Sequence, residues 1–140
     1  MVILSVDVGK KRTGVSVCDK SEILAYPQPV ISEHNPERIV RKIVELVEQH
    51  KAEVLVVGLP LNMDGSEGES ARFSREIAKL VTEESEVKVE FSDERLSTVV
   101  AHQRLHESGL KMKQHKDKVD SQAAVIILEN YLQKRKNLAK

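Results

Sequence analysis

Cysteine and aromatic residues are scarce in this chain of 140 residues. The single cysteine, Cys18, excludes an internal disulfide and a cysteine-based metal cluster. Because Cys18 lies in a strand-like run, we expect it to be a buried, inert thiol. Tryptophan is absent and aromatic residues make up only 3% of the chain, so the core must consist mostly of Val, Ile, Leu and Ala. Such a core suits a buried parallel sheet packed under helices.

The chain also lacks an excess of charge of either sign. Lysine plus arginine and aspartate plus glutamate number 22 each, for a formal net charge of zero. A protein that coats nucleic acid nonspecifically is usually basic overall, so that class is disfavoured. Contact with nucleic acid stays open because basic residues cluster locally, at Lys10–Arg12, Lys111–Lys118 and Lys134–Lys136.

Long apolar runs are missing as well. The run Val2–Val6 is too short for a signal peptide and is followed by Asp7. No stretch approaches the ~20 apolar residues that a membrane-spanning helix needs. We therefore expect a soluble, cytoplasmic protein that does not bind membranes. Its length and the lack of linkers, repeats and low-complexity stretches predict one domain over residues 1–140.

The amino-terminal part of the chain is predicted to form three antiparallel strands. Residues 2–8 are mostly apolar or β-branched, and residues 15–18 follow a turn, as in a hairpin. A third strand is predicted over residues 23–31, where Pro27 and Pro29 restrict it to the edge of a sheet.

Helices and strands then alternate along the chain. Apolar residues recur at helical spacing from Pro36 to about His50, and Asn35 is the expected cap. A short strand is predicted over residues 54–57. The polar segment 62–68 is predicted to be a loop that leads into a second helix.

The last part of the chain completes the expected fold. A strand is predicted around Val87–Phe91, and Ser97 or Thr98 can cap a helix that runs to about Glu107. A basic loop is then expected before a last helix from about Lys118 to Lys136. The whole order predicts an α/β fold, in which a mixed sheet has helices on both faces.

Asp7 is the most informative residue, because a carboxylate at the end of an apolar strand is poorly explained by solubility. Strand alternation places it on the opposite face from Val6. A buried carboxylate is costly unless it is paired, hydrogen-bonded or bound to a metal. Two interpretations stay open for Asp7 alone: a cap for the adjacent turn Gly9–Gly14, or a functional carboxylate.

Two further acids lie at the ends of predicted elements. Glu94, beside Asp93, follows the strand that ends near Phe91, and ligands bind at the carboxyl ends of parallel strands in α/β sheets. If that strand runs parallel to the first, Asp7 and Glu94 emerge at the same edge. Asp120 opens the last helix. Each acid also has a simpler interpretation. Glu94 can belong to a solvated turn, and Asp120 can interact favourably with the helix dipole.

Taken together, the three acids indicate a metal site. Carboxylates that lie close together repel one another unless a cation neutralises them. Ligand sets made only of oxygen select Mg²⁺ or Mn²⁺. Two such ions about 4 Å apart would clamp the attacking and leaving oxygens of a phosphodiester displacement. Asp7, Glu94 and Asp120 are therefore the candidate catalytic residues and metal ligands.

Neighbouring residues fit a phosphate substrate. Arg12, with Lys11 before it, and Arg95 flank two of the acids, and arginine can grip phosphate with two hydrogen bonds. Asn62 and the amides of its loop precede a helix, where a backbone phosphate can bind. Each basic residue taken alone is also compatible with a solvated surface charge. The candidate substrate-binding residues are Lys11, Arg12, Asn62 and Arg95.

Four segments together resemble the YqgF/RuvX family of RNase H-like proteins. They occur in the family's order and span most of the chain, from about Ile3 to Leu132. The segments are DVGKKRTGV at 7–15, VGLPLNMDG at 57–65, DERLST at 93–98, and KVDS with AAVIIL at 118–128. The first segment alone would be a weak signal, whereas all four in order are highly specific.

This resemblance implies an RNase H-like fold and assigns catalytic acids to Asp7, Glu94 and Asp120, with Asp93 as a substitute or helper. It also implies a bacterial cytoplasmic protein that matures the 5′ end of 16S ribosomal RNA. The family has been described as a Holliday junction resolvase too, by analogy with RuvC. Our leading hypothesis is a nuclease that processes precursor ribosomal RNA.

Three alternatives remain open at this stage. The first is a resolvase of branched DNA, which would ordinarily act as a symmetric homodimer. The second is an ATPase or sugar kinase of the actin-like fold, although such enzymes bind ATP between two domains and one is predicted here. The third is a noncatalytic RNA-binding factor for ribosome assembly, against which the three acids argue.

Overall fold

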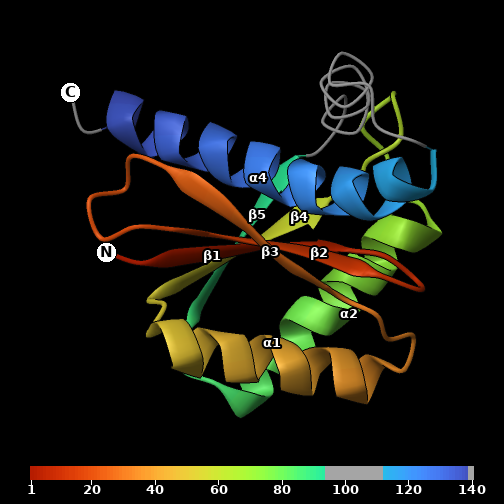
Figure 1. Cartoon of the computed structure of the whole chain (residues 1–140). Coiled ribbons are helices and arrows are strands. Elements are labelled where there is room, and N and C mark those ends of the chain that lie inside the picture. Colours follow the sequence, from red (N-terminus) through yellow and green to blue (C-terminus); the bar gives the residue numbers. More distant parts are fainter. Residues whose placement is uncertain (94–111, 139–140) are drawn as a thin grey trace.

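A five-stranded sheet separates helices α1 (Pro36–His50) and α2 (Glu69–Glu84) from helix α4 (Met112–Leu138) (Figure 1). The computed structural model describes residues 1–93 and the backbone of residues 112–138, with side chains from residue 122 onward in that helix. The elements are β1 (Ile3–Val8), β2 (Thr13–Cys18), β3 (Ala25–Ile31), α1 (Pro36–His50), β4 (Val54–Leu59), α2 (Glu69–Glu84), β5 (Lys88–Asp93) and α4 (Met112–Leu138).

The sheet has the strand order β3-β2-β1-β4-β5. The first three strands are antiparallel, and β4 and β5 run parallel to β1. This topology confirms the predicted mixed sheet. Pro27 and Pro29 lie in β3, which is the outermost strand on its side, as expected for residues without a backbone donor.

The first helix begins where the sequence predicted it. Asn35 has an extended backbone, and its side-chain Oδ1 accepts a hydrogen bond from the Glu37 amide at 2.9 Å, with Pro36 in the first turn. The helix ends at His50, and Lys51 adopts the left-handed conformation that often terminates helices. Its buried apolar face packs on the sheet through Ile39, Val40, Ile43 and Val47.

Several predicted boundaries differ from the structure or lie outside it. Strand β2 begins at Thr13, two residues before the predicted start, and β3 begins at Ala25, two residues after it. The segment after Lys111 was predicted to be a loop up to Lys118, but α4 already begins at Met112. Residues 112–118 contain neither glycine nor proline, and their mostly straight side chains favour a helix, while their polarity hides the helical period. Strand β4 continues two residues beyond the predicted end at Val57. The helix predicted from Ser97 to Glu107 lies outside the described residues.

Alternation along β1 divides the core into two parts. Leu4, Val6 and Val8 pack in the cluster beneath α1 and α2. Ile3 packs on the other face with Ile127 and Leu128 of α4. The odd-numbered residues of β1 therefore face α4.

A buried polar contact fixes α4 on that face. The hydroxyls of Ser5 and Ser16, which are fully buried, both reach the carbonyl oxygen of Ala124, at 2.7 and 2.9 Å. Hydrogen bonds satisfy these hydroxyls, which would otherwise be costly to bury. The contact aligns Ala124 with the middle of β1, and later residues of α4 pack toward the start of that strand. The amino-terminal part of α4 therefore points to the end of β1 that carries Asp7.

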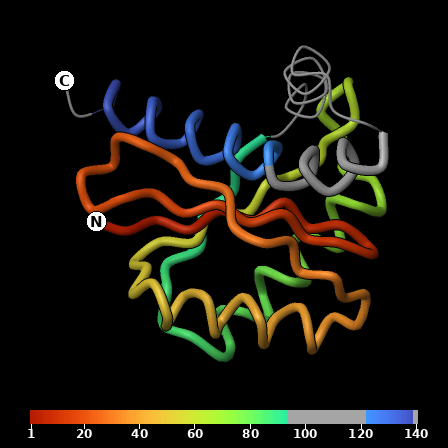
Figure 2. Tube along the Cα trace, viewed as in Figure 1, coloured from red at the N-terminus to blue at the C-terminus, as the bar shows by residue number. Residues whose placement is uncertain are grey.

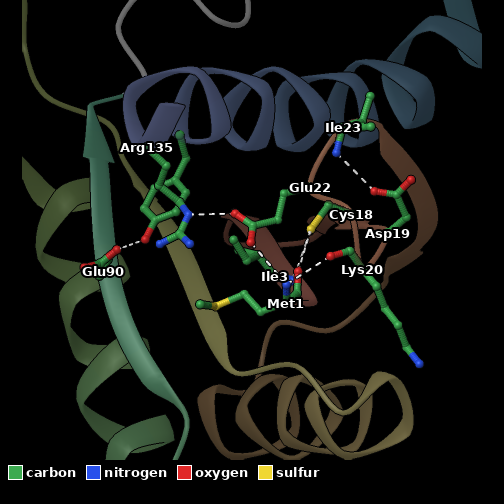
Figure 3. Close-up of polar contacts among 10 residues, drawn as sticks. Met1, Ile3, Cys18, Asp19, Lys20, Glu22, Ile23, Glu90 and Arg135 are labelled. Atoms are coloured by element: carbon green, nitrogen blue, oxygen red, sulfur yellow. Dashed lines mark hydrogen bonds and ion pairs between the residues drawn. The ribbon is translucent and has the colours of Figure 1, made fainter. Parts of the chain in front are cut away.

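A network of ion pairs closes the opposite end of the molecule (Figure 3). Glu22 accepts from the Met1 amino group at 3.1 Å and from Arg135 Nε at 2.8 Å. These contacts join the amino terminus, the β2–β3 connection and the last turns of α4, which lie on one side of the molecule in Figure 2. Cys18 is buried beside them, and desolvation raises the pKa of its thiol, which agrees with the expected inert role.

The Glu22 network predicts a specific dependence of stability on pH. The hydrogen bond from Arg135 lowers the pKa of Glu22 below its ordinary value. A lowered carboxyl pKa adds stability that is fully present above the unfolded pKa and is lost as the pH falls through the folded one. We expect the melting temperature of the wild type to fall more steeply below about pH 4.5 than that of Glu22→Gln. Parallel slopes in thermal denaturation would contradict the role given to Glu22.

Candidate active site at the carboxyl edge of the sheet

Asp7 lies in the central strand of the sheet, one residue before the end of β1. It pairs with Gly14 of β2 and is half-buried, in contrast to the fully buried Ser5 two residues earlier. Since Asp7 shares the face of Ser5, its carboxylate is on the side of the sheet that α4 covers. This is the placement expected of a functional carboxylate, which must be held by the core and still be reachable.

A tight turn follows Asp7 and carries two of the candidate phosphate contacts. The backbone of Gly9 approaches the carbonyl oxygen of Arg12 so closely that a Cβ atom at residue 9 would overlap it. Lys11 is exposed and Arg12 is half-buried. Lys10 reaches Glu69 at the start of α2 at 3.5 Å, a weak exposed pair. The turn thus presents basic residues directly beside the end of β1.

Gly9 should therefore tolerate no side chain. We expect Gly9→Ala to lower the free energy of unfolding by about 1–3 kcal/mol, because a rigid backbone oxygen occupies the place of the new methyl group. Gly68→Ala is the matched control, since its Cβ would meet Asn62 Oδ1 at an ordinary 3.5 Å, and a loss below about 1 kcal/mol is expected. Urea denaturation measures both, and equal losses would contradict the steric argument.

Strand β5 ends at the same edge as β1, as the sequence argument required. Ser5, Val56 and Glu90 occupy one row across the parallel strands. Glu90 therefore shares the face of Ser5 and Asp7, which agrees with its contact to Tyr131 of α4. Asp93, three residues later, has the opposite parity.

Asp93 and Phe91 lie on the same face of β5, and the contacts of Phe91 show which face this is. The guanidinium of Arg75 in α2 lies 4.9 Å from the ring centroid of Phe91. That face of β5 is therefore directed to α2, away from the face of Asp7. Glu94 and Arg95, the predicted acid and phosphate contact at this strand end, lie outside the described residues.

The third predicted acid, Asp120, belongs to α4. It precedes Ala124 by four residues, about one helical turn, on the side of that contact toward the end of β1. The helix thus brings the backbone of residue 120 toward Asp7, although the side chain of Asp120 lies outside the described residues.

Asn62 lies in a short loop between β4 and α2. Its side-chain Nδ2 donates to Ser66 Oγ at 2.9 Å, and its carbonyl accepts from the Gly65 amide at 2.8 Å. Gly65 has a φ of 87°, which glycine adopts readily. The side chain of Asn62 thus shapes its own loop, a role that the sequence interpretation did not include.

The donor types at this edge fit a divalent ion. Two of the three predicted ligands are not described at the side-chain level, and the described residues contain no group of three His, Cys, Asp or Glu side chains that could hold a metal ion. Asp7 supplies a half-buried oxygen donor, and its proposed partners are also carboxylates, the set that Mg²⁺ or Mn²⁺ prefers.

Comparison with known proteins decides the family. The model of the RuvX family, described as a Holliday junction resolvase, matches residues 1–134. The chain belongs to the RuvX family. RuvX relatives include a protein of Chloroflexus aurantiacus named "Putative pre-16S rRNA nuclease", which is 40% identical over 136 residues, covering 97% of this chain and 89% of the relative. A protein of Clostridium botulinum with the same name is 40% identical over 132 residues, or 94% and 96% of the two chains.

Solved structures confirm the fold of this RuvX chain. Thermus thermophilus RuvC matches with a TM-score of 0.60 at 16% identity, over 98% of this chain and 97% of RuvC. The same protein in complex with a Holliday junction substrate matches with a TM-score of 0.61 at 16% identity, over 96% and 95%. These similarities confirm the predicted RNase H-like α/β architecture.

The family and the relatives agree on the class of enzyme. Their names indicate a nuclease that acts on phosphodiester bonds, which confirms the class predicted from the sequence. Within the described residues, no helix is long and apolar enough to cross a membrane.

Proposed function

We propose that this RuvX protein is a cytoplasmic, Mg²⁺- or Mn²⁺-dependent nuclease that trims the 5′ end of precursor 16S rRNA. The position of Asp7 carries the proposal: a half-buried carboxylate at the end of the central strand, on the face that α4 covers. The choice of substrate is supported by the name that the relatives share.

Asp7, Glu94 and Asp120 are the proposed metal ligands. When bound, divalent ions supply an activated water and stabilise the leaving alkoxide. Strand alternation favours Glu94 over Asp93, because Asp93 has the parity of Phe91, on the face directed to α2. On this assignment the alternation of β5 would continue by one residue, which would give position 94 the parity of Asp7.

The basic residues beside the acids would hold the substrate. Lys11 and Arg12 occupy the turn that Gly9 tightens, so their backbone is fixed relative to Asp7. Arg95 would contact the phosphate from the end of β5. Asn62 would contribute through the loop that its side chain shapes, whose amides precede α2.

A second candidate function is the resolution of four-way DNA junctions, which the description of the family model favours. The chemistry at the acids would be the same. Cutting two strands symmetrically would require a homodimer, whereas trimming one RNA end does not. The two proposals therefore differ in substrate and in assembly.

Cleavage of a substrate panel tests the proposed function. A 5′-extended 16S precursor, an unrelated single-stranded RNA and a four-way DNA junction are each incubated with Mg²⁺, Mn²⁺ or EDTA. We expect metal-dependent cutting of the precursor at its 5′ extension. Cutting confined to the junction would establish the resolvase instead. ATP turnover without cleavage would indicate a kinase-like protein, and tight RNA binding without cleavage an assembly factor.

A further inference from the structure

A cavity of about 610 Å³ lies along the edge strand β5 and reaches the second half of α4, so residues from both faces of the strand line it. Its volume falls within the roughly 300–1,000 Å³ typical of sites for small ligands. Its lining includes aromatic rings, hydrogen-bond donors and a positive charge, from Phe91, Ser92, Asn130, Tyr131 and Lys134. None of these residues belongs to the proposed catalytic site.

Aromatic residues are concentrated in this cavity. The chain contains only two Phe and two Tyr, and one of each lines it. Phe91 is 40% exposed, and the Arg75 guanidinium lies over its ring. Tyr131 is half-buried, and its hydroxyl donates a hydrogen bond to Glu90, which holds the ring in place. An exposed aromatic ring in so aromatic-poor a chain is available for stacking with a nucleobase.

The charges of the cavity argue against a phosphate-rich duplex. Lys134 and Arg135 are balanced by Glu90 and Asp93 among the lining residues, and Arg135 is also paired with Glu22 at 2.8 Å. A surface that grips a duplex depends on many basic contacts. Stacking on aromatic rings with one cation for the backbone is instead typical of contacts with single strands.

The cavity extends from the carboxyl end of β5, at the proposed catalytic edge, to Lys134 and Arg135 in the last turns of α4. Asp93, at the carboxyl end of β5, is one of its lining residues, and Ser92 shares the parity of Glu90 and thus the face of Asp7. Strands β5 and β1 are separated by β4, so two spacings of about 4.8 Å, or roughly 10 Å, divide them. One nucleic acid strand can therefore reach both places.

We propose that this cavity binds a nucleobase of a single-stranded RNA segment next to the cleaved bond, by stacking on the exposed ring of Phe91 and by a phosphate contact to Lys134. The inference rests on the proposed function and narrows its substrate to RNA that is unpaired on one side of the cut. Asn130 and Ser92 supply hydrogen-bonding groups at the cavity wall for the edge of the base.

Binding without metal tests this proposal. Fluorescence anisotropy with a 5′-fluorescein-labelled single-stranded RNA decamer in EDTA gives the affinity in the absence of cleavage. We expect Phe91→Leu to weaken binding by about five- to thirtyfold, the equivalent of roughly 1–2 kcal/mol per stacked base. Lys134→Gln should reduce the slope of log Kd against log salt by about 0.7. Lys136→Gln, on the same helix but lining a different cavity beside the β2–β3 connection, is the matched control and should change little.

Two further measurements make the outcome unambiguous. Phe91→Tyr, which keeps the ring, should restore binding, so a loss caused by misfolding is distinguished from loss of stacking. A duplex of the same sequence should bind Phe91→Leu and the wild type equally. Unchanged affinity of both Phe91→Leu and Lys134→Gln for the single strand, or an equal loss for the duplex, would overturn the proposal.

The proposal and the proposed function can fail separately. If Asp7→Asn still cleaves RNA while Phe91→Leu loses affinity, the metal site is wrong and the base-binding cavity stands. If Asp7→Asn is inactive while Phe91→Leu binds and cleaves as the wild type does, the metal site stands and the cavity has no role in binding.

Discussion

Replacing Asp7 with asparagine is expected to lower the rate of phosphodiester cleavage by about 10³-fold while leaving the fold intact. The amide keeps the shape of the side chain but loses the charge that a divalent ion requires. Because Asp7 is only half-buried, the substitution removes no packing from either core cluster. In the absence of metal, the melting temperature should stay the same or rise, since one charge leaves an acidic site.

Asp19→Asn provides the matched control for this experiment. Asp19 is also a half-buried aspartate beside a strand, but it follows β2 at the other end of the hairpin and accepts from the Ile23 amide at 3.1 Å. We expect Asp19→Asn to cleave at nearly the wild-type rate in a single-turnover assay with the precursor RNA. Comparable activity of Asp7→Asn and Asp19→Asn would refute a catalytic role for Asp7.

The adjacent acids Asp93 and Glu94 are expected to differ sharply in their effects. Glu94→Gln should reduce cleavage by about 10³-fold, as removal of any proposed ligand should, whereas Asp93→Asn should change it less than about threefold. The reason is the register of β5, in which Asp93 has the parity of Phe91 on the face directed to α2. Paired single-turnover rates at saturating Mg²⁺ give the comparison.

This pair of variants also tests the strand alignment itself. A large loss in Asp93→Asn and a small one in Glu94→Gln would mean that the alternation from Glu90 does not continue to the site. Equal large losses would assign both acids to the metals. Only the predicted order agrees with the parity argument.

Local sequence signals predicted much of the architecture because each had a local physical cause. Asn35 before Pro36 is an N-cap followed by a residue that needs no amide donor, and the helix begins there. Pro27 and Pro29 have no backbone N–H to donate to a neighbouring strand, and they lie in β3, an edge strand. The start of α4 was missed because its first turns are mostly polar. They therefore show no helical spacing of apolar residues from which a helix could be predicted.

The candidate site required information that no local pattern contains. From the sequence, Asp7 and the end of β5 lie at one edge only if β1 and β5 run parallel. The parallel pairing of β1 with β4 and of β4 with β5 shows that they do. The difference between Asp93 and Glu94 depends on the register, which is set by long-range packing. The buried Ser5–Ser16–Ala124 contact was missed, although serines within apolar strands signalled it.

Direct measurement of metal binding tests the central claim that Asp7, Glu94 and Asp120 together hold the divalent ions. Titration of the metal-free protein with Mn²⁺, followed by electron paramagnetic resonance, reports bound ions independently of cleavage. Saturable binding is predicted for the wild type and for Asp19→Asn, with a loss of at least about tenfold in affinity for Asp7→Asn and Asp120→Asn. Equal affinity and stoichiometry in all four proteins would contradict the account.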